Sequence, residues 1–285
     1  MWSHGVVGAI EPDPAVLTEV AARVAAEAAD LVRTARADIS AGRGVAVDTK
    51  TSDTDVVTAV DHDSERFVRR RLAELRPGDP VLGEEGGGEV GTESAEGSAA
   101  VTWVVDPIDG TVNFLYGFPV FAVSVAAQVG GVSVAGAVVE PVSGRRWTAT
   151  RGAGAWLDGE PLRVSRPAGL DQALLATGFA YQVRRRARQA RLMAGVLEHV
   201  RDIRRAGAAS LDLCAVAAGW HDAYFEHGLN RWDWAAGALI AAEAGAVVSL
   251  PGEDPQLGAD ATLAASPAVA SALRAVLVDC GAADV

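Results

Sequence analysis

The sequence predicts a layered fold of the mixed α/β or α+β class. Strand-like and helix-like segments alternate along the chain, and 285 residues are enough to bury one large core or two coupled ones. No internal repeat and no linker separates autonomous domains. We therefore expect a first half at 1–156, an antiparallel sheet with helices, and a second half at 157–285, a smaller mixed sheet, with a functional site where they meet.

The first half begins with two predicted helices. The alanine-rich run over 15–39 follows an Asp-Pro pair that is typical of a helix start, and it predicts a long helix. Thr58 and Asp61 have the spacing of a capping box, which predicts a second helix through 64–72. Asp61 could serve only as the acid of that box.

Strands in the first half are predicted to end in acidic residues. Residues 81–83 lead to Glu84, and 103–105 lead to Asp106. No charged residue occurs over 110–139, but interruptions by Pro, Gln, Gly and Ser argue against a membrane span and favour a buried hairpin.

In the second half, short strands alternate with helices, and the residues around 203–210 are typical of a strand, a loop and a helix start. Strands are predicted there at 173–177 and 222–226, and helices at 184–200, 232–244 and 266–278. One more strand is predicted at 147–150, in the first half.

The composition limits the partners. A formal charge of −12 argues against nucleic acid or an anionic membrane as the main partner, since either requires a basic surface. The start of the chain has no basic segment of a signal peptide, so we expect a cytoplasmic protein. Cys214 and Cys280 are then expected to be reduced thiols.

The segment from Asp106 to Gly110 carries two carboxylates on a tight loop. Pro107 fixes its own φ and favours extended geometry at Asp106, so the carboxylates of Asp106 and Asp109 are positioned before any ligand binds. Such oxygen ligands suit hard cations such as Mg²⁺. An isolated motif of this kind would more often be a simple turn.

Residues 106–114, Asp-Pro-Ile-Asp-Gly-Thr-Val-Asn-Phe, resemble the metal-binding signature of the inositol monophosphatase family. Three further stretches at 50–61, 83–85 and 232–237 agree with the family in the same order. The resemblance implies a layered αβαβα sandwich of the inositol monophosphatase and fructose-bisphosphatase type. It also implies an Mg²⁺-dependent, Li⁺-sensitive sugar-phosphate phosphatase, a small phosphorylated polyol as substrate, and a homodimer.

The resemblance assigns roles to individual residues. Two or three Mg²⁺ ions per subunit would be held by Glu84, Asp106, the carbonyl of Ile108, Asp109 and Asp233. Lys50 and Asp61 would lie just outside these ligands. The catalytic group would be Glu84, Thr111, Asp106 and Asp109, with Thr111 and Glu84 orienting a water activated by the cations.

Substrate contacts are implied for Asp109, Gly110, Thr111, Ala209, Glu226 and Asp233. The backbone of Gly110 and Thr111 would face the phosphate at a helix start, although Thr111 could also be an N-cap. Glu226 could also be an ordinary acid at a strand end, although the functional role is the preferred interpretation. The arginines over 184–200 could receive a phosphate or simply be solvated. We expect the histidines to lie away from these motifs and to have surface or packing roles.

The predicted activity is hydrolysis of myo-inositol 1-phosphate by direct attack of water, without a covalent phosphoenzyme. Histidinol phosphate and fructose 1,6-bisphosphate are rival substrates within the family. A non-catalytic regulatory binding protein on the same fold is the alternative from another class. That alternative would be favoured by a lost metal ligand, and none is lost.

Overall fold

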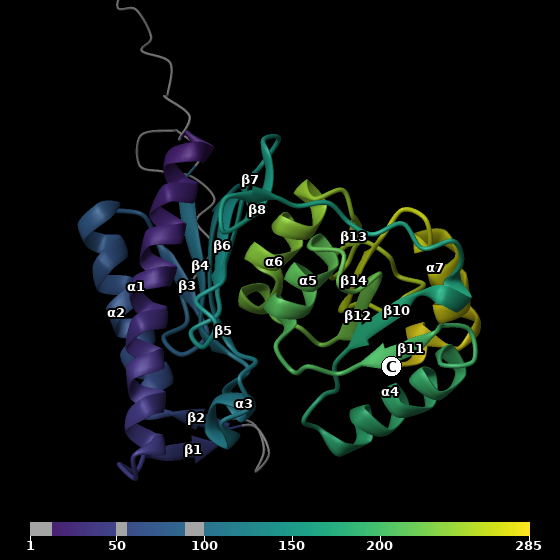
Figure 1. Ribbon diagram of the computed structural model, residues 1–285, viewed down its shortest axis with the longest axis horizontal. Helices are drawn as coiled ribbons and strands as arrows, with labels where there is room; N and C mark the ends of the chain where they lie inside the picture. The colour runs from purple at the N-terminus through teal and green to yellow at the C-terminus, as the bar shows by residue number, and fades with distance from the viewer. Residues whose placement is uncertain (1–12, 50–55, 89–99) are drawn as a thin grey trace, which may run out of the picture.

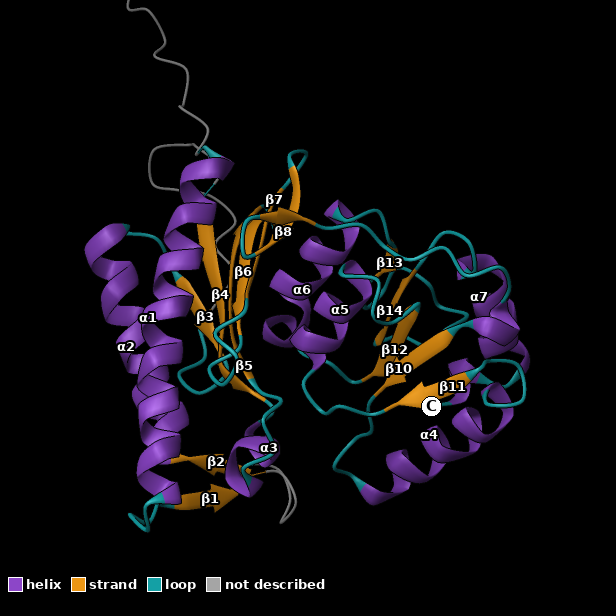
Figure 2. Cartoon of the chain, viewed as in Figure 1, coloured by secondary structure: helices purple, strands orange, loops and turns teal. Residues whose placement is uncertain are grey.

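Helix and sheet layers alternate through the computed structural model, which describes residues 13–49, 56–88 and 100–285 (Figure 1, Figure 2). An outer helix pair covers one face of a seven-stranded sheet, a second pair lies between that sheet and a five-stranded sheet, and a third pair covers the far face. The αβαβα sandwich is therefore confirmed. In layer order the pairs are α1 (Pro14–Ser40) with α2 (Ala59–Leu75), α5 (Ala209–Ala217) with α6 (Arg231–Glu243), and α4 (Val183–Val196) with α7 (Ala270–Asp279).

The seven-stranded sheet runs in chain order. Its strands are β3 (Val81–Gly83), β4 (Val101–Asp109), β5 (Ala122–Val129), β6 (Val132–Val139), β7 (Arg146–Thr150), β8 (Gly154–Leu157) and β9 (Glu160–Pro161). The predicted hairpin is confirmed, because β5 and β6 pair across Gly130 and Gly131, whose φ values of 57° and 80° suit a tight hairpin turn. The expectation of an antiparallel sheet is wrong at one edge. There β3 pairs with β4 in parallel, which the long connection between them permits.

The five-stranded sheet is mixed, as predicted. Its order is β11-β10-β12-β14-β13, with parallel pairs on both sides of β10 and antiparallel pairs elsewhere. The strands are β10 (Leu174–Thr177), β11 (Asp202–Arg204), β12 (Ala223–His227), β13 (Val247–Ser249) and β14 (Ala261–Ala265). Outside the two sheets lie β1 (Val47–Thr49), β2 (Val56–Thr58), the short helix α3 (Thr111–Tyr116) and 3₁₀ turns at Leu170–Gln172 and Ala282–Asp284.

Three apolar clusters fill the spaces between the layers. The central cluster packs α5 and α6 between the two sheets, and every residue of β4 is buried. The uncharged run that raised the question of a membrane span forms α3 and the largely buried strands β5 and β6 of the first sheet. None of the described helices has the length and apolar character that crossing a membrane requires.

Some boundaries differ from the predictions. The helix expected through 64–72 begins at Ala59, because the capping box itself supplies its first turn. The helix expected over 184–200 ends at Val196, and α7 begins at Ala270 rather than beside Pro267. The division at 156/157 stays a prediction, and β8 of the first sheet crosses it.

The close contact between α5 and α6 can be tested at Gly237. A Cβ there would lie 2.9 Å from Leu213 Cβ and 3.1 Å from the Ser210 carbonyl oxygen. We expect Gly237→Leu to lower the free energy of unfolding by about 1–3 kcal/mol, since crowding outweighs the gain in helix propensity. Thermal unfolding measures this, with Gly44→Leu as the control, because nothing lies within 4 Å of a Cβ at Gly44. An unchanged melting temperature for Gly237→Leu would contradict the packing.

Candidate active site

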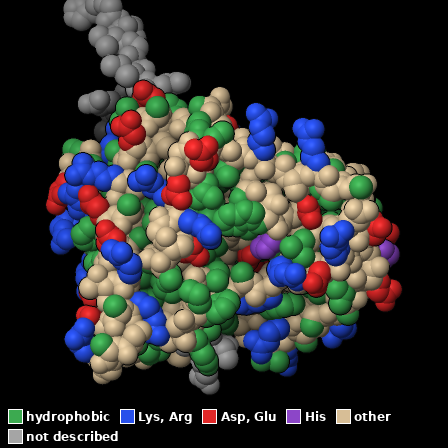
Figure 3. All heavy atoms as spheres, viewed as in Figure 1, with side chains coloured by type: hydrophobic (Ala, Val, Ile, Leu, Met, Phe, Trp, Pro, Cys, Tyr) green, Lys and Arg blue, Asp and Glu red, His purple; other side chains and the backbone are tan. Residues whose placement is uncertain are grey.

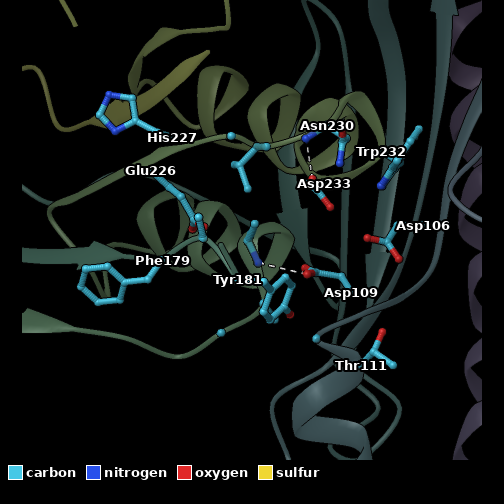
Figure 4. A pocket seen from close by; sticks show the side chains of 18 of the residues that line it. Asp106, Asp109, Thr111, Phe179, Tyr181, Glu226, His227, Asn230, Trp232 and Asp233 are labelled. Atoms are coloured by element: carbon cyan, nitrogen blue, oxygen red, sulfur yellow. Dashed lines mark hydrogen bonds between the residues drawn. The ribbon is translucent and has the colours of Figure 1, made fainter. Parts of the chain in front are cut away.

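A pocket of about 510 Å³ opens where the end of β4 meets the starts of α5 and α6. The side chains that line it come from different elements, with Asp106 and Thr111 on one side and Glu226 on the other (Figure 4). The pocket brings together the predicted residues Glu84, Asp106, Ile108, Asp109, Gly110, Thr111, Ala209, Glu226 and Asp233. Lys50 lies outside the described residues.

Asp106 lies near the end of the fully buried strand β4 and has 2% of its surface exposed. Its Oδ1 accepts the N–H of Ile108 at 3.1 Å, which folds the loop back on itself. Ser64 of α2 donates to the Pro107 carbonyl at 3.1 Å and anchors the same loop. Burial, and then the negative charge of Glu84, raises the pKa of Asp106 well above its ordinary value.

Asp109 connects the two halves of the chain. Its Oδ1 accepts the N–H of Ala209 at 3.1 Å, and its Oδ2 accepts the N–H and the hydroxyl of Ser210 at 2.7 and 2.5 Å. The carboxylate therefore satisfies the free donors at the start of α5. Burial raises the pKa of Asp109, while the bonds from Ser210 act in the opposite direction. Because the Ala209 N–H is donated to Asp109, the substrate contact at Ala209 stays a prediction.

Asp233 lies in the first turn of α6. Its Oδ2 accepts the N–H of Asn230 at 2.6 Å, and Figure 4 shows its carboxyl group entering the pocket above Asp109. Burial, followed by the charges of Glu84 and Asp109, raises its pKa well above the ordinary value. The pocket thus concentrates negative charge that water does not screen.

Thr111 is the first residue of α3, so its interpretation as an N-cap is wrong. The cap is Gly110, whose φ of 92° and lack of a Cβ allow it to lie against the Val120 and Gly207 carbonyls. The Thr111 hydroxyl lies 3.0 Å from Asp61 Oδ1 and 3.0 Å from the Ile108 carbonyl oxygen.

The capping box at the start of α2 is confirmed. Asp61 accepts the backbone N–H of Thr58 at 2.8 Å, and the Thr58 hydroxyl accepts the N–H of Asp61 at 3.3 Å. The other oxygen of Asp61 faces Thr111. One fully buried carboxylate therefore begins a helix and also positions a hydroxyl at the pocket.

Glu226 lies next to the last residue of β12, on the side of the pocket away from Asp106 (Figure 4). The Tyr224 hydroxyl donates to its Oε2 at 2.6 Å, and burial raises the pKa of Glu226 to about 7. A Cβ at Gly178 would lie 1.8 Å from Oε2, so only glycine leaves room for this carboxylate. Neither Gly178 nor Tyr224 was predicted from the sequence. The contact of Gly178 with Glu226 exists only between neighbouring strands, whereas Tyr224 lies two residues before Glu226 on the same strand, a spacing that the sequence does show.

Glu65 of α2 was also missed. Its carboxylate accepts the N–H groups of Glu85 and Gly86 at 2.7 and 2.8 Å, and Arg69 donates to it at 2.7 Å. This carboxylate holds the loop that carries Glu84. A Glu-Arg pair four residues apart is typical of a solvated helix face, which is why the pattern did not reveal the buried role.

The expectation for the histidines holds only in part. His227 packs against Phe225 and its Nε2 lies 2.7 Å from the Leu257 carbonyl oxygen, with its ring turned away from the pocket (Figure 4). His62 contradicts the expectation that the histidines lie away from the motifs. Its Nδ1 is 4.0 Å from Glu85 Oε2, directly beside the loop of Glu84.

The donor set fits a hard divalent cation in its chemistry. Oxygen ligands from three separate elements face one pocket, and their charges raise one another's pKa values, which a cation would reverse. As they stand, no three His, Cys, Asp or Glu side chains in 13–49, 56–88 and 100–285 form a complete coordinating group.

Comparison with known proteins gives the class. A sequence model described as "Inositol monophosphatase family" matches residues 13–281, nearly the whole chain. The chain belongs to the inositol monophosphatase family. Members of this family are generally metal-dependent.

Individual relatives narrow the comparison. The chain is 56% identical over 275 residues to a Mycobacterium leprae protein named "Inositol-1-monophosphatase", covering 93% of this chain and 94% of that one. This similarity shows that the present chain is a phosphoric monoester hydrolase. A solved structure, "Mycobacterium tuberculosis SuhB", has a TM-score of 0.80 at 48% identity and covers 95% of this chain and 100% of that chain. A Pseudomonas aeruginosa relative named "Nus factor SuhB" is 46% identical over 198 residues, 68% of this chain and 72% of its own.

The clustered acids predict a pH-dependent stability of the metal-free protein. Their folded pKa values lie above those of the unfolded chain, so their contribution to stability is present below about pH 4 and is lost as pH rises through the folded values, which reach about 7 for Glu226. We expect the melting temperature in EDTA to fall between pH 5 and pH 8, and Mg²⁺ to raise it more at pH 8.

Asp106→Asn provides the control for this effect, because it removes one of the interacting charges. In EDTA its melting temperature should vary less with pH than that of the unaltered protein, as measured by calorimetry. A metal-free protein that becomes more stable as pH rises from 5 to 8 would contradict the electrostatic account.

Proposed function

We propose that this protein is a metal-dependent phosphatase that hydrolyses myo-inositol 1-phosphate and related polyol monophosphates to the free alcohol and phosphate. The observation that supports this most is the convergence of Asp106, Asp109 and Asp233 on one pocket that also contains Glu226. Acids at one end suit the phosphate with its cations, and a hydrogen-bonding carboxylate at the other suits a hydroxylated leaving group.

Glu84, Asp106, the Ile108 carbonyl, Asp109 and Asp233 would hold two or three Mg²⁺ ions. Bound there, the cations would neutralise the charge of the phosphate and supply a nucleophilic water at neutral pH. Asp109 is already in position for this role, because its hydrogen bonds to the start of α5 hold it at the boundary between the two halves. Lys50 and Asp61 would act just outside the ligands.

Thr111 and Glu84 would orient the attacking water. When the Thr111 hydroxyl donates a hydrogen bond to Asp61, its lone pairs point away from that carboxylate. They can then accept a hydrogen bond from the water. The backbone of Gly110 and Thr111, at the start of α3, would face the phosphate. Asp61 thereby sets the direction in which Thr111 can act.

Glu226 would recognise the leaving group. Its Oε2 receives the Tyr224 hydroxyl, so Oε1 is the oxygen that remains for a ring hydroxyl. With a pKa of about 7, it can accept a hydrogen bond when ionised and donate one when protonated. Asp233 would help return a proton to the departing oxygen.

A regulatory binding protein remains the second candidate. The specific observation in its favour is the name "Nus factor SuhB" carried by a relative that aligns over 68% of this chain. The complete set of acids in the pocket favours catalysis. On the face seen in Figure 3, acidic and basic side chains are intermixed around an apolar area, which does not suggest a nucleic-acid surface there.

We also propose a homodimer in the cytoplasm that is sensitive to Li⁺. Tyr116 is the last residue of α3 and Phe118 follows the helix, and their side chains are 86% and 49% exposed. They provide apolar surface for a second subunit. Cys214 and Cys280 are free thiols, which suits a reducing compartment.

Asp106→Asn tests the reaction type. We expect kcat/KM for myo-inositol 1-phosphate to fall at least about a hundredfold, because the variant loses a ligand charge at the centre of the pocket. Phosphate release measures the rate, and Asp63→Asn, an exposed acid of α2, is the matched control. Unchanged hydrolysis by the Asp106 variant would end the proposal. If the Asp106 variant loses hydrolysis but keeps its biological effect, the result would favour a regulatory binding protein.

A panel of esters tests the substrate. We expect kcat/KM to be highest for myo-inositol 1-phosphate among that ester, histidinol phosphate and fructose 1,6-bisphosphate. Glu226 can accept a ring hydroxyl, which histidinol phosphate lacks, and fructose 1,6-bisphosphate brings a second phosphate that the acids would repel. A preference for histidinol phosphate by orders of magnitude would show that the substrate assignment is wrong while leaving the reaction type intact.

A further inference from the structure

Arg231 is the first residue of α6, two positions before Asp233. A positive charge at the start of a helix opposes the helix dipole, which favours acids at that place. The residues on either side, Asn230 and Trp232, line the pocket, whereas Arg231 does not. The interactions that account for an arginine at this position must therefore lie outside the pocket.

The Arg231 side chain reaches the β5–β6 hairpin of the first sheet. Its Nη1 donates to Gln128 Oε1 at 2.8 Å and lies 3.4 Å from the Gly131 carbonyl oxygen. Its guanidinium carbon lies 5.5 Å from the centre of the Trp234 ring, three residues further along α6. These partners are neutral, and within the described part of the chain Arg231 forms no ion pair. The side chain thus ties the start of α6 to the sheet.

Gln128 is held in the orientation that this bond requires. It is fully buried near the end of β5, and its Nε2 donates to the Ser133 hydroxyl at 3.1 Å across the hairpin. The amide nitrogen therefore faces Ser133, and Oε1 faces Arg231. A buried amide oxygen without a donor is unfavourable, so the bond to Arg231 favours one position of the helix start on the sheet.

Asp233 lies in the same turn of α6, and its carboxyl group enters the pocket (Figure 4). The Asn230 N–H fixes that carboxylate relative to its own helix. It does not fix the helix relative to Asp106, which belongs to β4 of the sheet. The bond between Arg231 and Gln128 provides such a link, because β5 pairs directly with β4.

An arginine close to acids can also act through its charge alone. The guanidinium of Arg231, however, donates to the hairpin, where residues 122–139 include no charged side chain. A charge that served only the acids would need no buried and oriented acceptor on β5. The geometry therefore indicates that the position of the helix, rather than charge compensation, is what Arg231 provides.

We propose that Arg231 is a positioning residue for Asp233. Through Gln128 it holds the first turn of α6, and with it the Asp233 carboxylate, in a fixed place relative to Asp106, and it thereby raises the affinity for Mg²⁺ without contacting the ion. The inference rests on the proposed function, since it takes Asp106 and Asp233 as acids that hold Mg²⁺.

Calorimetric titration of the metal-free protein with Mg²⁺ tests this, using the unaltered protein, Arg231→Met, Gln128→Met and the double variant. Gln128→Met is the decisive change, because it removes the bond and leaves the positive charge near the acids. Arg151→Met is the matched control, since Arg151 donates to the Ser133 carbonyl at 2.7 Å and so binds the same hairpin without linking it to α6. Melting temperatures in EDTA verify that each variant is folded.

We expect Arg231→Met and Gln128→Met each to raise the Kd for Mg²⁺ at least about fivefold. The double variant should bind within about twofold of either single variant, because all three lose the same bond. In hydrolysis of myo-inositol 1-phosphate, the Mg²⁺ concentration that gives half the maximal rate should rise, while kcat at saturating Mg²⁺ stays within about twofold. Arg151→Met should leave the Kd for Mg²⁺ unchanged, even if it lowers the melting temperature.

An unchanged Kd for Gln128→Met would overturn the inference, since Arg231 would then act through its charge or not at all. An equal rise in Kd for Arg151→Met would overturn it as well, because general loosening of the hairpin would explain the effect, and so would the absence of Mg²⁺ binding to the unaltered protein. The proposed function fails by a different result, which is the absence of myo-inositol 1-phosphate hydrolysis by the unaltered protein.

Discussion

The hydrogen bonds from the start of α5 to the Asp109 carboxylate are the interaction on which the arrangement of the site depends. They join the last residue of a buried strand in one sheet layer to a helix of the next layer. A carboxylate at a helix N-terminus is favourable for both groups, because the helix offers unpaired donors and a partial positive charge. The same bonds fix the separation between the acids of β4 and the residues that follow Gly207, and so determine the width of the pocket.

The pocket around Asp109 contains several acidic side chains whose negative charges repel one another when no cation is bound. Burial and mutual repulsion raise the pKa values of Asp106 and Asp233, so the acids resist ionising together. The surrounding scaffold keeps them in place by other means. Glu65 holds the loop of Glu84, and Asn230 binds Asp233. In the proposed metal site, cation affinity and stability would therefore be coupled through the same carboxylates.

Three glycines shape the wall of the pocket that contains Glu226. Glu226 occupies the space that a Cβ at Gly178 would take, and Arg205 and Arg185 lie against Gly207 and Gly228 in the same way. Three charged groups therefore reach the pocket because three glycines leave space for them. The Glu226 side of the pocket is shaped by these close approaches, whereas the Asp106 side is shaped by strand ends and helix starts.

The sequence by itself determined the class of fold, most of its elements and the acids of the pocket. Patterns of apolar residues follow local periodicity, and the acids stand within short motifs whose order is visible along the chain. Only the tertiary structure decided which of these residues share contacts. The parallel edge at β3, the bond of Asp109 to Ser210, the buried role of Glu65 and the space at Gly178 all depend on segments far apart in sequence. No local pattern records such pairs, because packing between layers, rather than propensity within an element, brings them together.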